Sequence, residues 1–315
     1  MPPTLSAAFP TRRNDWRAWF PAALLLAGLA TLPVLPPFTI HFLALVLTYG
    51  TWAMSFGLVM GQLGLTTFGH AALFGGGAYA AAWTALNVSD ALLAGLAAGA
   101  LFGTVLGAVL GLVLGRLSGV AFAIGTLAFG GMVTQVANSW TAVTGGSDGL
   151  VGLPFPRLAG HDLDDRALYA AALLLATITS AALQSILRHR PGIILHAVRD
   201  NPLRADSSGI PVHRVRVLTL AASGTLAGAA GALSAYIVGS VAPSSVDWSA
   251  SGAVLVMAVL GGVASVTGPL AGAAAYTILE QFLSQLLPNY RLVLGFVFIA
   301  IVLLAPGGVG VRRAR

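Results

Sequence analysis

The chain has 315 residues, of which 57% are hydrophobic and only 8% are charged, against about 25% charged in a typical soluble protein, so it is predicted to be an integral membrane protein. It carries 16 basic and 10 acidic residues, a net charge of +6, and no cysteine, which excludes disulfides and thiolate metal sites. Every basic residue is arginine, and the absence of lysine excludes a P-loop ATPase and a Schiff-base enzyme.

The hydropathy pattern predicts an all-α fold, a polytopic bundle of transmembrane helices. Each helix needs about 20 mostly apolar residues to cross a bilayer. The eighth of ten candidate segments is short, and Gly261, Gly262 and Pro269 interrupt the region after it. We expect some segments to be broken or re-entrant, which leaves eight to ten spans. The candidates are 18–35, 41–60, 64–86, 91–115, 119–140, 167–187, 216–239, 251–264, 268–286 and 291–305.

The arginines predict the orientation of the bundle. Ten spans place Arg116, the segment 188–216 and both arginine-rich termini on one side, which the positive-inside rule assigns to the cytoplasm. We therefore expect a cytoplasmic arm (1–17), a transmembrane domain (18–311) and a cytoplasmic tail (312–315). A cleaved signal peptide is the alternative for the first span. No aromatic residue interleaves with the arginines of the segment 188–216, so nucleic acid is not an expected partner.

The third candidate segment is unusually polar and rich in glycine. Its polar residues recur at i, i+4, i+5 and i+8, which predicts one stripe on a helix that the following glycines loosen. The stripe either lines a solute pathway, as broken helices do, or holds neighbouring helices by hydrogen bonds. A lone histidine is too little for a metal site. The candidate pathway residues are Gln62, Thr66, Thr67, His70, Gly75 and Gly76.

The fourth segment carries glycine at every fourth position. Gly103, Gly107, Gly111 and Gly115 fall on one helical face. Small residues at this spacing let two helices approach closely in lipid, where packing replaces the hydrophobic driving force. We therefore expect a packing ridge here.

A turn-rich loop, TGGSDG, follows the fifth segment on the predicted outer side. Ser147 and Asp148 are candidates for contact with an external protein. Asp148 equally fits a role in capping a turn.

The segment 188–216, here called the arginine island, contains six arginines between two almost uncharged regions. Residues 193–199 can form a short helix, after which Asn201 is a suitable N-cap with Pro202 at the first helical position. Residues 203–208 can form a second helix that Gly209 ends. Five apolar side chains would then be available to a partner: Ile193, Ile194, Ala197, Val198 and Leu203. The alternative is a solvated loop that only sets topology.

Four segments in matching order resemble the permease subunits of bacterial ABC importers of the branched-chain amino acid family, most closely the LivM type. They are HAVRDNPLRADSSGI in the arginine island, GQLGLTTFGHAALFGGGAYAAA (61–82), TGGSDGLVGLP (144–154) and VLGGVASVTGPLAGAAAYTILE (259–280). The ending 303–310 is also similar, so the likeness covers about residues 40–310.

The resemblance implies a transport subunit rather than an enzyme, in a bacterial inner membrane. Its expected partners are a second homologous permease subunit, two cytoplasmic ATPases and a periplasmic solute-binding protein. No cofactor is expected in this chain, because ATP and magnesium would bind the ATPases. The segment matching the family's coupling loop supplies the candidate ATPase contacts: Arg199, Asp200, Asn201, Pro202, Leu203, Arg204 and Gly209.

Few ionisable groups lie within the spans. His70 and Glu280 are the exceptions, and two isolated groups make a poor proton or sodium relay, which favours ATP coupling. Glu280 either serves the pathway, or lies near a helix end or pairs with Arg291. A self-sufficient secondary transporter or channel is the alternative function. No motif indicates catalysis.

Overall fold

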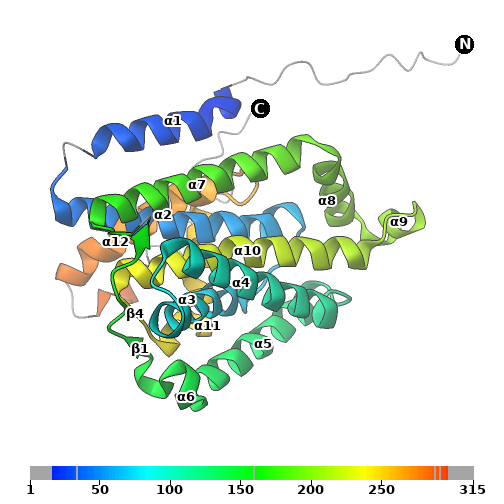
Figure 1. Ribbon diagram of the computed structural model, residues 1–315. Coiled ribbons are helices and arrows are strands. Elements are labelled where there is room, and N and C mark those ends of the chain that lie inside the picture. Colours follow the sequence, from blue (N-terminus) through cyan, green and yellow to red (C-terminus); the bar gives the residue numbers. More distant parts are fainter. Residues whose placement is uncertain (1–15, 33–34, 159, 287–288, 291, 297–315) are drawn as a thin grey trace, which may run out of the picture.

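The computed structural model describes residues 16–32, 35–158, 160–286, 289–290 and 292–296. It is a bundle of helices with a few two-residue strands (Figure 1), so the predicted all-α class is confirmed. The predicted C-terminal tail, most of the N-terminal arm and most of the segment 291–305 lie outside these residues.

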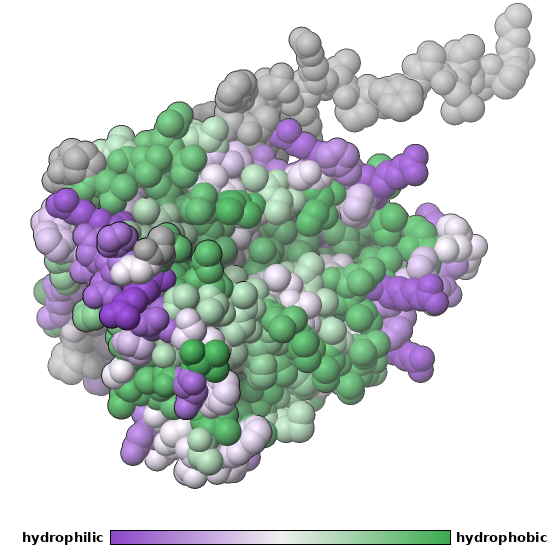
Figure 2. Space-filling model, viewed as in Figure 1, coloured by the Kyte–Doolittle hydropathy of each residue, from purple (hydrophilic) through white to green (hydrophobic). Residues whose placement is uncertain are grey.

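The two ends of the bundle differ in charge. At one end, here called the arginine end, lie α8 (Arg190–Asp200) and α9 (Pro202–Ser207). At the other, the strand end, β1 (Leu150–Val151) pairs antiparallel with β4 (Ser240–Val241). Figure 2 shows hydrophilic residues gathered at both ends and a broad hydrophobic band between them. This distribution fits a bundle that sits across a bilayer.

Five of the described helical segments are long and apolar enough to cross a membrane. Their bounds agree with five predicted spans to within four residues. The bundle places α10 beside α2, α4 and α3 (His70–Asn87), with α7 against α2. The five segments are α2 with its π-helical continuation (Pro37–Gln62), α4 (Leu92–Leu114), α5 (Gly119–Ser139), α7 (Asp165–Arg188) and α10 (Val212–Val238).

The first and eighth predicted spans are short helices. α1 (Trp16–Thr31) packs on α7. α11 (Trp248–Gly261) has 14 residues and is therefore about 21 Å long, less than the hydrocarbon core of about 30 Å. A turn joins it to α12 (Gly268–Leu286), and Gly261 packs directly against the backbone of Gly268. The helical interruption expected at these glycines is present, between Gly261 and Gly268.

The third predicted span begins later than expected. α2 (Pro37–Gly57) continues as a π-helix, Leu58–Gln62, and residues 63–69, here called the helix break, are not helical. α3 (His70–Asn87) then runs without interruption through its three glycines. The predicted helical stripe is therefore wrong, because Thr66 and Thr67 lie in the break. The loosening at Gly75 and Gly76 is also wrong.

Tight packing explains why the glycines of α3 do not loosen it. A Cβ on Gly75 would overlap Val246, one on Gly76 would crowd Leu106, and one on Gly77 would overlap the backbone of Gly228. These glycines allow close approach of neighbouring segments rather than helix bending.

α3 and α11 both begin inside the bundle, each after a non-helical stretch. The backbone N–H of Ala71, in the first turn of α3, donates to Ser251 Oγ in the first turn of α11, at 2.9 Å. Within the break, Phe68 N–H donates to Thr126 Oγ1 at 3.0 Å. Irregular backbone is stable in such a place when protein groups replace water as hydrogen-bond partners.

The glycine ridge of α4 packs on α10, as predicted. A Cβ on Gly103 would overlap the carbonyl oxygen of Gly224, and one on Gly107 that of Leu220. The small residues are reciprocal, since a Cβ on Gly228 would overlap the carbonyl oxygen of Gly99. The two backbones are therefore in direct contact along most of the ridge.

We expect Gly103→Leu to destabilise the bundle, because four extra carbons cannot fit between α4 and α10. Overpacking costs about 1–3 kcal/mol where neighbours can shift, and here the neighbour is backbone. Thermal unfolding of the detergent-purified protein measures the effect. Gly131→Leu on α5 is the matched control, because nothing lies within 4 Å of a Cβ there. Equal unfolding temperatures for both variants would contradict the packing account.

Candidate functional site

The arginine island folds as two short helices, as its caps predict. Asn201 Oδ1 accepts a hydrogen bond from the backbone N–H of Arg204 at 3.0 Å, with Pro202 at the first helical position of α9. Gly209 ends the turn after α9 with φ +83°, a conformation that glycine adopts without strain. The island is therefore an ordered two-helix surface.

One face of this surface packs on the bundle and the other is exposed. Ile193 is 71% exposed and Leu203 81% exposed, and Asp200 and Arg204 are also exposed. Val198 is only 2% exposed and belongs to the main hydrophobic core. The prediction that Val198 is available to a partner is therefore wrong, because it lies on the inner face of α8.

α8 is hydrogen-bonded to the place where α2 ends. Arg199 Nη1 donates to the carbonyl oxygen of Gly61, one of the carbonyls that the end of a helix leaves without an intrahelical partner. The side chain of Gln62 bridges two elements: Oε1 lies 2.9 Å from His196 Nε2, and Nε2 donates to the carbonyl oxygen of Ala264 at 3.4 Å. These contacts join α8, the end of the π-helix just before the helix break, and the α11–α12 turn.

Arg216 has a different role from the exposed arginines of the island. It is buried near the start of α10, and its Nη1 donates to the carbonyl oxygens of Gly115 at 3.0 Å and Leu117 at 2.9 Å. It therefore caps the end of α4, where unpaired carbonyls favour a cation. The charge pattern of the sequence did not show that Arg216 is buried while the other arginines of the island are exposed.

His70 is fully buried at the start of α3. Its Nε2 lies 3.1 Å from Ser55 Oγ, and its ring stands edge-on to Phe56. Ser223 Oγ in turn donates to the carbonyl oxygen of Ser55 at 2.7 Å, so these residues connect α2, α3 and α10. These contacts favour the interpretation that His70 holds neighbouring helices together by hydrogen bonds over the interpretation that it lines a solute pathway.

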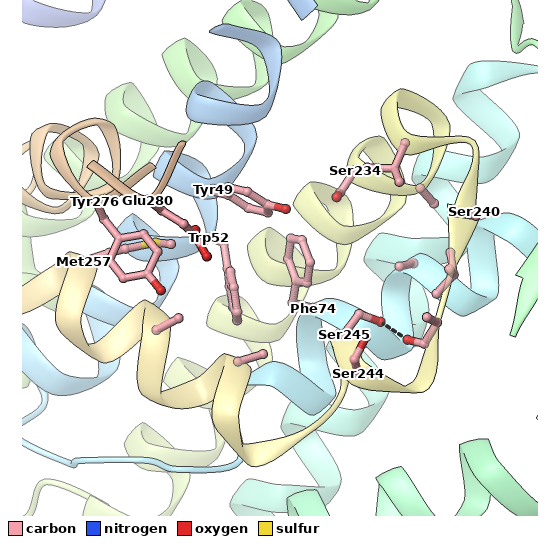
Figure 3. Close-up of a pocket in the computed structure, with 17 residues that line it drawn as sticks. Tyr49, Trp52, Phe74, Ser234, Ser240, Ser244, Ser245, Met257, Tyr276 and Glu280 are labelled. Carbon is pink, nitrogen blue, oxygen red and sulfur yellow. Dashed lines mark hydrogen bonds between the residues drawn. The ribbon is translucent and has the colours of Figure 1, made fainter. Parts of the chain in front are cut away.

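A cavity of about 440 Å³ lies within the bundle between α2, α3, α10, α11 and α12 (Figure 3). None of the six candidate pathway residues lines it. The sequence signals that could have located it are the aromatic residues of α2 and the lone Glu280. The labelled lining residues are Tyr49, Trp52, Phe74, Ser234, Ser240, Ser244, Ser245, Met257, Tyr276 and Glu280.

The loop predicted to contact an external protein lies at the strand end, next to a group of paired charges. Ser147 and Asp148 are exposed in a 3-10 turn, where Ser147 Oγ donates to Asp148 Oδ1 at 3.2 Å. Further along, Arg157 in β2 (Arg157–Leu158) donates to Asp162 in β3 (His161–Asp162) at 2.6 Å and lies 3.1 Å from Asp90. The hydrogen bond and charge of Asp162, with Asp90, raise the pKa of Arg157, so it stays a cation.

Comparison with known proteins places these features in a family. The family described as "Branched-chain amino acid transport system / permease component" matches residues 38–302. The LivM protein of Escherichia coli (strain K12), a "high-affinity branched-chain amino acid transport system permease protein", is 28% identical, with 90% of this chain and 74% of the relative covered. The LivM protein of Salmonella typhimurium (strain LT2) is 27% identical with the same coverage. No solved structure gives a significant match.

The matched region includes α2 to α12, the helix break, the arginine island and the cavity. The chain therefore belongs to the family of branched-chain amino acid transport permease components. It is a multi-pass membrane transport subunit of the LivM type, as its motifs indicate.

We expect Arg216→Met to destabilise the protein by about 1.5–3 kcal/mol, the usual contribution of hydrogen bonds to a charged group. Methionine keeps the apolar part of the arginine side chain, so the loss of stability measures the two hydrogen bonds to the carbonyl oxygens at the end of α4. Arg214→Met is the matched control, because Arg214 is exposed on the same turn of α10. Chemical unfolding monitored by tryptophan fluorescence compares the two variants. An unchanged midpoint for Arg216→Met would show that the α4 cap is dispensable.

Proposed function

We propose that this chain carries branched-chain amino acids, or closely related small polar solutes, across a bacterial inner membrane. The names of its LivM relatives support this substrate class. The bundle crosses the membrane eight to ten times within one permease domain, residues 18–311. The arginine end, with both termini, faces the cytoplasm, as the positive-inside rule favours.

Separate ATPase subunits drive this transport, and we assign their docking site to the exposed face of α8 and α9. The observation that carries this assignment is the two-helix surface itself, with Ile193 and Leu203 exposed beside Asp200 and Arg204. A central apolar anchor with a charged rim is the usual composition of a protein interface. ATP and magnesium bind the ATPases, and this chain holds no cofactor and performs no catalysis.

The remaining partners follow from the transport system. A second, homologous permease subunit completes the membrane unit, and lipid surrounds both. A periplasmic solute-binding protein delivers the solute to the strand end, where Ser147 and Asp148 are exposed for contact.

Hydrogen bonds provide a route from the docking site to the interior. When the ATPases move α8, Arg199 and His196 transmit the displacement to Gly61 and Gln62. The helix break beyond them is the part of α2–α3 without regular helical hydrogen bonding, so it can change conformation at low cost. α3, whose Phe74 lines the cavity, begins directly after the break.

We expect Leu203→Asp to abolish retention of the ATPase when the complex is purified in detergent, because an anchor at an interface contributes about 2 kcal/mol or more. Phe155→Asp is the matched control, since Phe155 is 74% exposed at the strand end. Pull-down with the co-expressed ATPases, with thermal unfolding of each variant, checks the result. Equal retention by Leu203→Asp and wild type would refute the docking assignment.

Transport itself is tested with the reconstituted complex. In vesicles whose ATPases face the interior, ATP enclosed in the vesicle is expected to drive leucine uptake when the binding protein is added outside. Uptake by this chain alone, driven by an ion gradient, would contradict the proposed function and favour a secondary transporter.

A further inference from the structure

The cavity combines an aromatic wall with two polar sides. Trp52 and Phe74 are stacked with ring centroids 4.3 Å apart and an interplanar angle of 22°. Tyr49 is tilted against both, at 6.4 Å from Trp52 and 6.1 Å from Phe74. Such rings offer a large apolar surface to a ligand side chain.

The polar groups lie on opposite sides of these rings. Figure 3 shows Glu280, Tyr276 and Met257 on one side and the serines on the other, with the aromatic side chains between them. Glu280 and Tyr49 line the same cavity. Among the described residues that line the cavity, Glu280 is the one carboxylate, and none is basic.

The serines come from an irregular segment that enters the bundle. Ser240 belongs to β4, and Ser244 and Ser245 follow in the 3-10 turn Pro243–Ser245. Ser245 Oγ already donates to the carbonyl oxygen of Ala242 at 2.7 Å. This side of the cavity is therefore polar but carries no charged side chain among the described lining residues.

We propose that this cavity is a binding site for an α-amino acid with an apolar side chain. Glu280 faces the ammonium group, and the Trp52–Phe74 pair holds the apolar side chain, which extends toward the side of the serines. Glu280 also interacts with neighbours in this structure, so the ammonium group shares or replaces those contacts. The site rests on the proposed function, and it places part of the pathway within one subunit.

The dimensions and position of the cavity agree with this assignment. Its volume falls in the range of about 300–1,000 Å³ that small-molecule sites occupy. Val238, Val241 and Ala242 line it at the strand end, where solute would arrive. The indole N–H of Trp52 is buried and finds no hydrogen-bond partner among the described residues, and a ligand acceptor in the cavity would provide one.

Binding of tritiated leucine to the full-length chain in lipid nanodiscs tests the site. We expect Glu280→Gln to weaken leucine binding about tenfold or more, since it removes the charge opposite the ammonium group without changing size. Isopentylamine, which lacks the carboxylate, should compete with leucine, whereas 4-methylpentanoate, which lacks the ammonium group, should not. Gln281→Ala, one residue further along α12 and not lining the cavity, should bind as wild type does.

A second variant tests the site independently, in case Glu280→Gln does not fold. Ser244 is exposed, so Ser244→Leu is tolerated by the fold but fills the cavity, and it should also reduce leucine binding about tenfold or more. Thermal unfolding of both variants confirms the fold.

Wild-type affinity in both variants, or equal competition by 4-methylpentanoate, would overturn the proposal. Leucine transport by the complete ATP-driven complex, together with no leucine binding by the chain, would overturn the cavity site and leave the proposed function standing. Failure of the complex to transport leucine would instead remove the proposed function.

Discussion

Inside a bilayer no water is available to backbone amides and carbonyls, so an interrupted helix is stable only where protein groups take the place of water. This constraint acts most strongly at the helix break. Arg199 binds the carbonyl oxygen of Gly61, the side chain of Gln62 bridges His196 and Ala264, and the N–H of Phe68 reaches Thr126. The groups that satisfy the end of the π-helix and the break therefore come from α8 and α5, and the side chain of Gln62 links this region to the α11–α12 turn. The region is thus a junction between the arginine island and the interior of the bundle.

Close backbone contact supports the rest of the bundle. α4 and α10 approach each other through glycines on both helices, and Gly77 of α3 reaches the backbone of Gly228 in the same region. Such contacts fix α3, α4 and α10 relative to one another. The irregular segment between α10 and α11, by contrast, leaves room for the cavity, whose wall it shares with the aromatic side chains of α2 and α3.

Local signals in the sequence predicted local structure well. Hydropathy located five long spans, the glycine spacing located the α4 ridge, and Asn201, Pro202 and Gly209 defined α9 because caps depend on a few adjacent residues. The start of α3 was missed because Thr66 and Thr67 fit a helical period, whereas the bond of the adjacent Phe68 N–H to Thr126 on α5 is a tertiary contact that the period does not show. Val198 was misplaced because periodicity alone does not show which face of a short helix packs inward. The cavity residues come from five helices, so no spacing along the chain could bring them together.

In the proposed mechanism, α8 controls the cavity through the hydrogen bond from Arg199 to the carbonyl oxygen of Gly61. Because the chain has no cysteine, Ser240→Cys provides the single labelling site of this chain, on the cavity wall, and its labelling can be followed on this subunit within the complete complex. The rate of reaction with a membrane-impermeant maleimide would be measured before and after trapping the ATPases with vanadate. We predict that trapping changes this rate severalfold, and that Arg199→Ala removes the change while the ATPases stay bound and active. The same change in rate with Arg199→Ala would contradict the account.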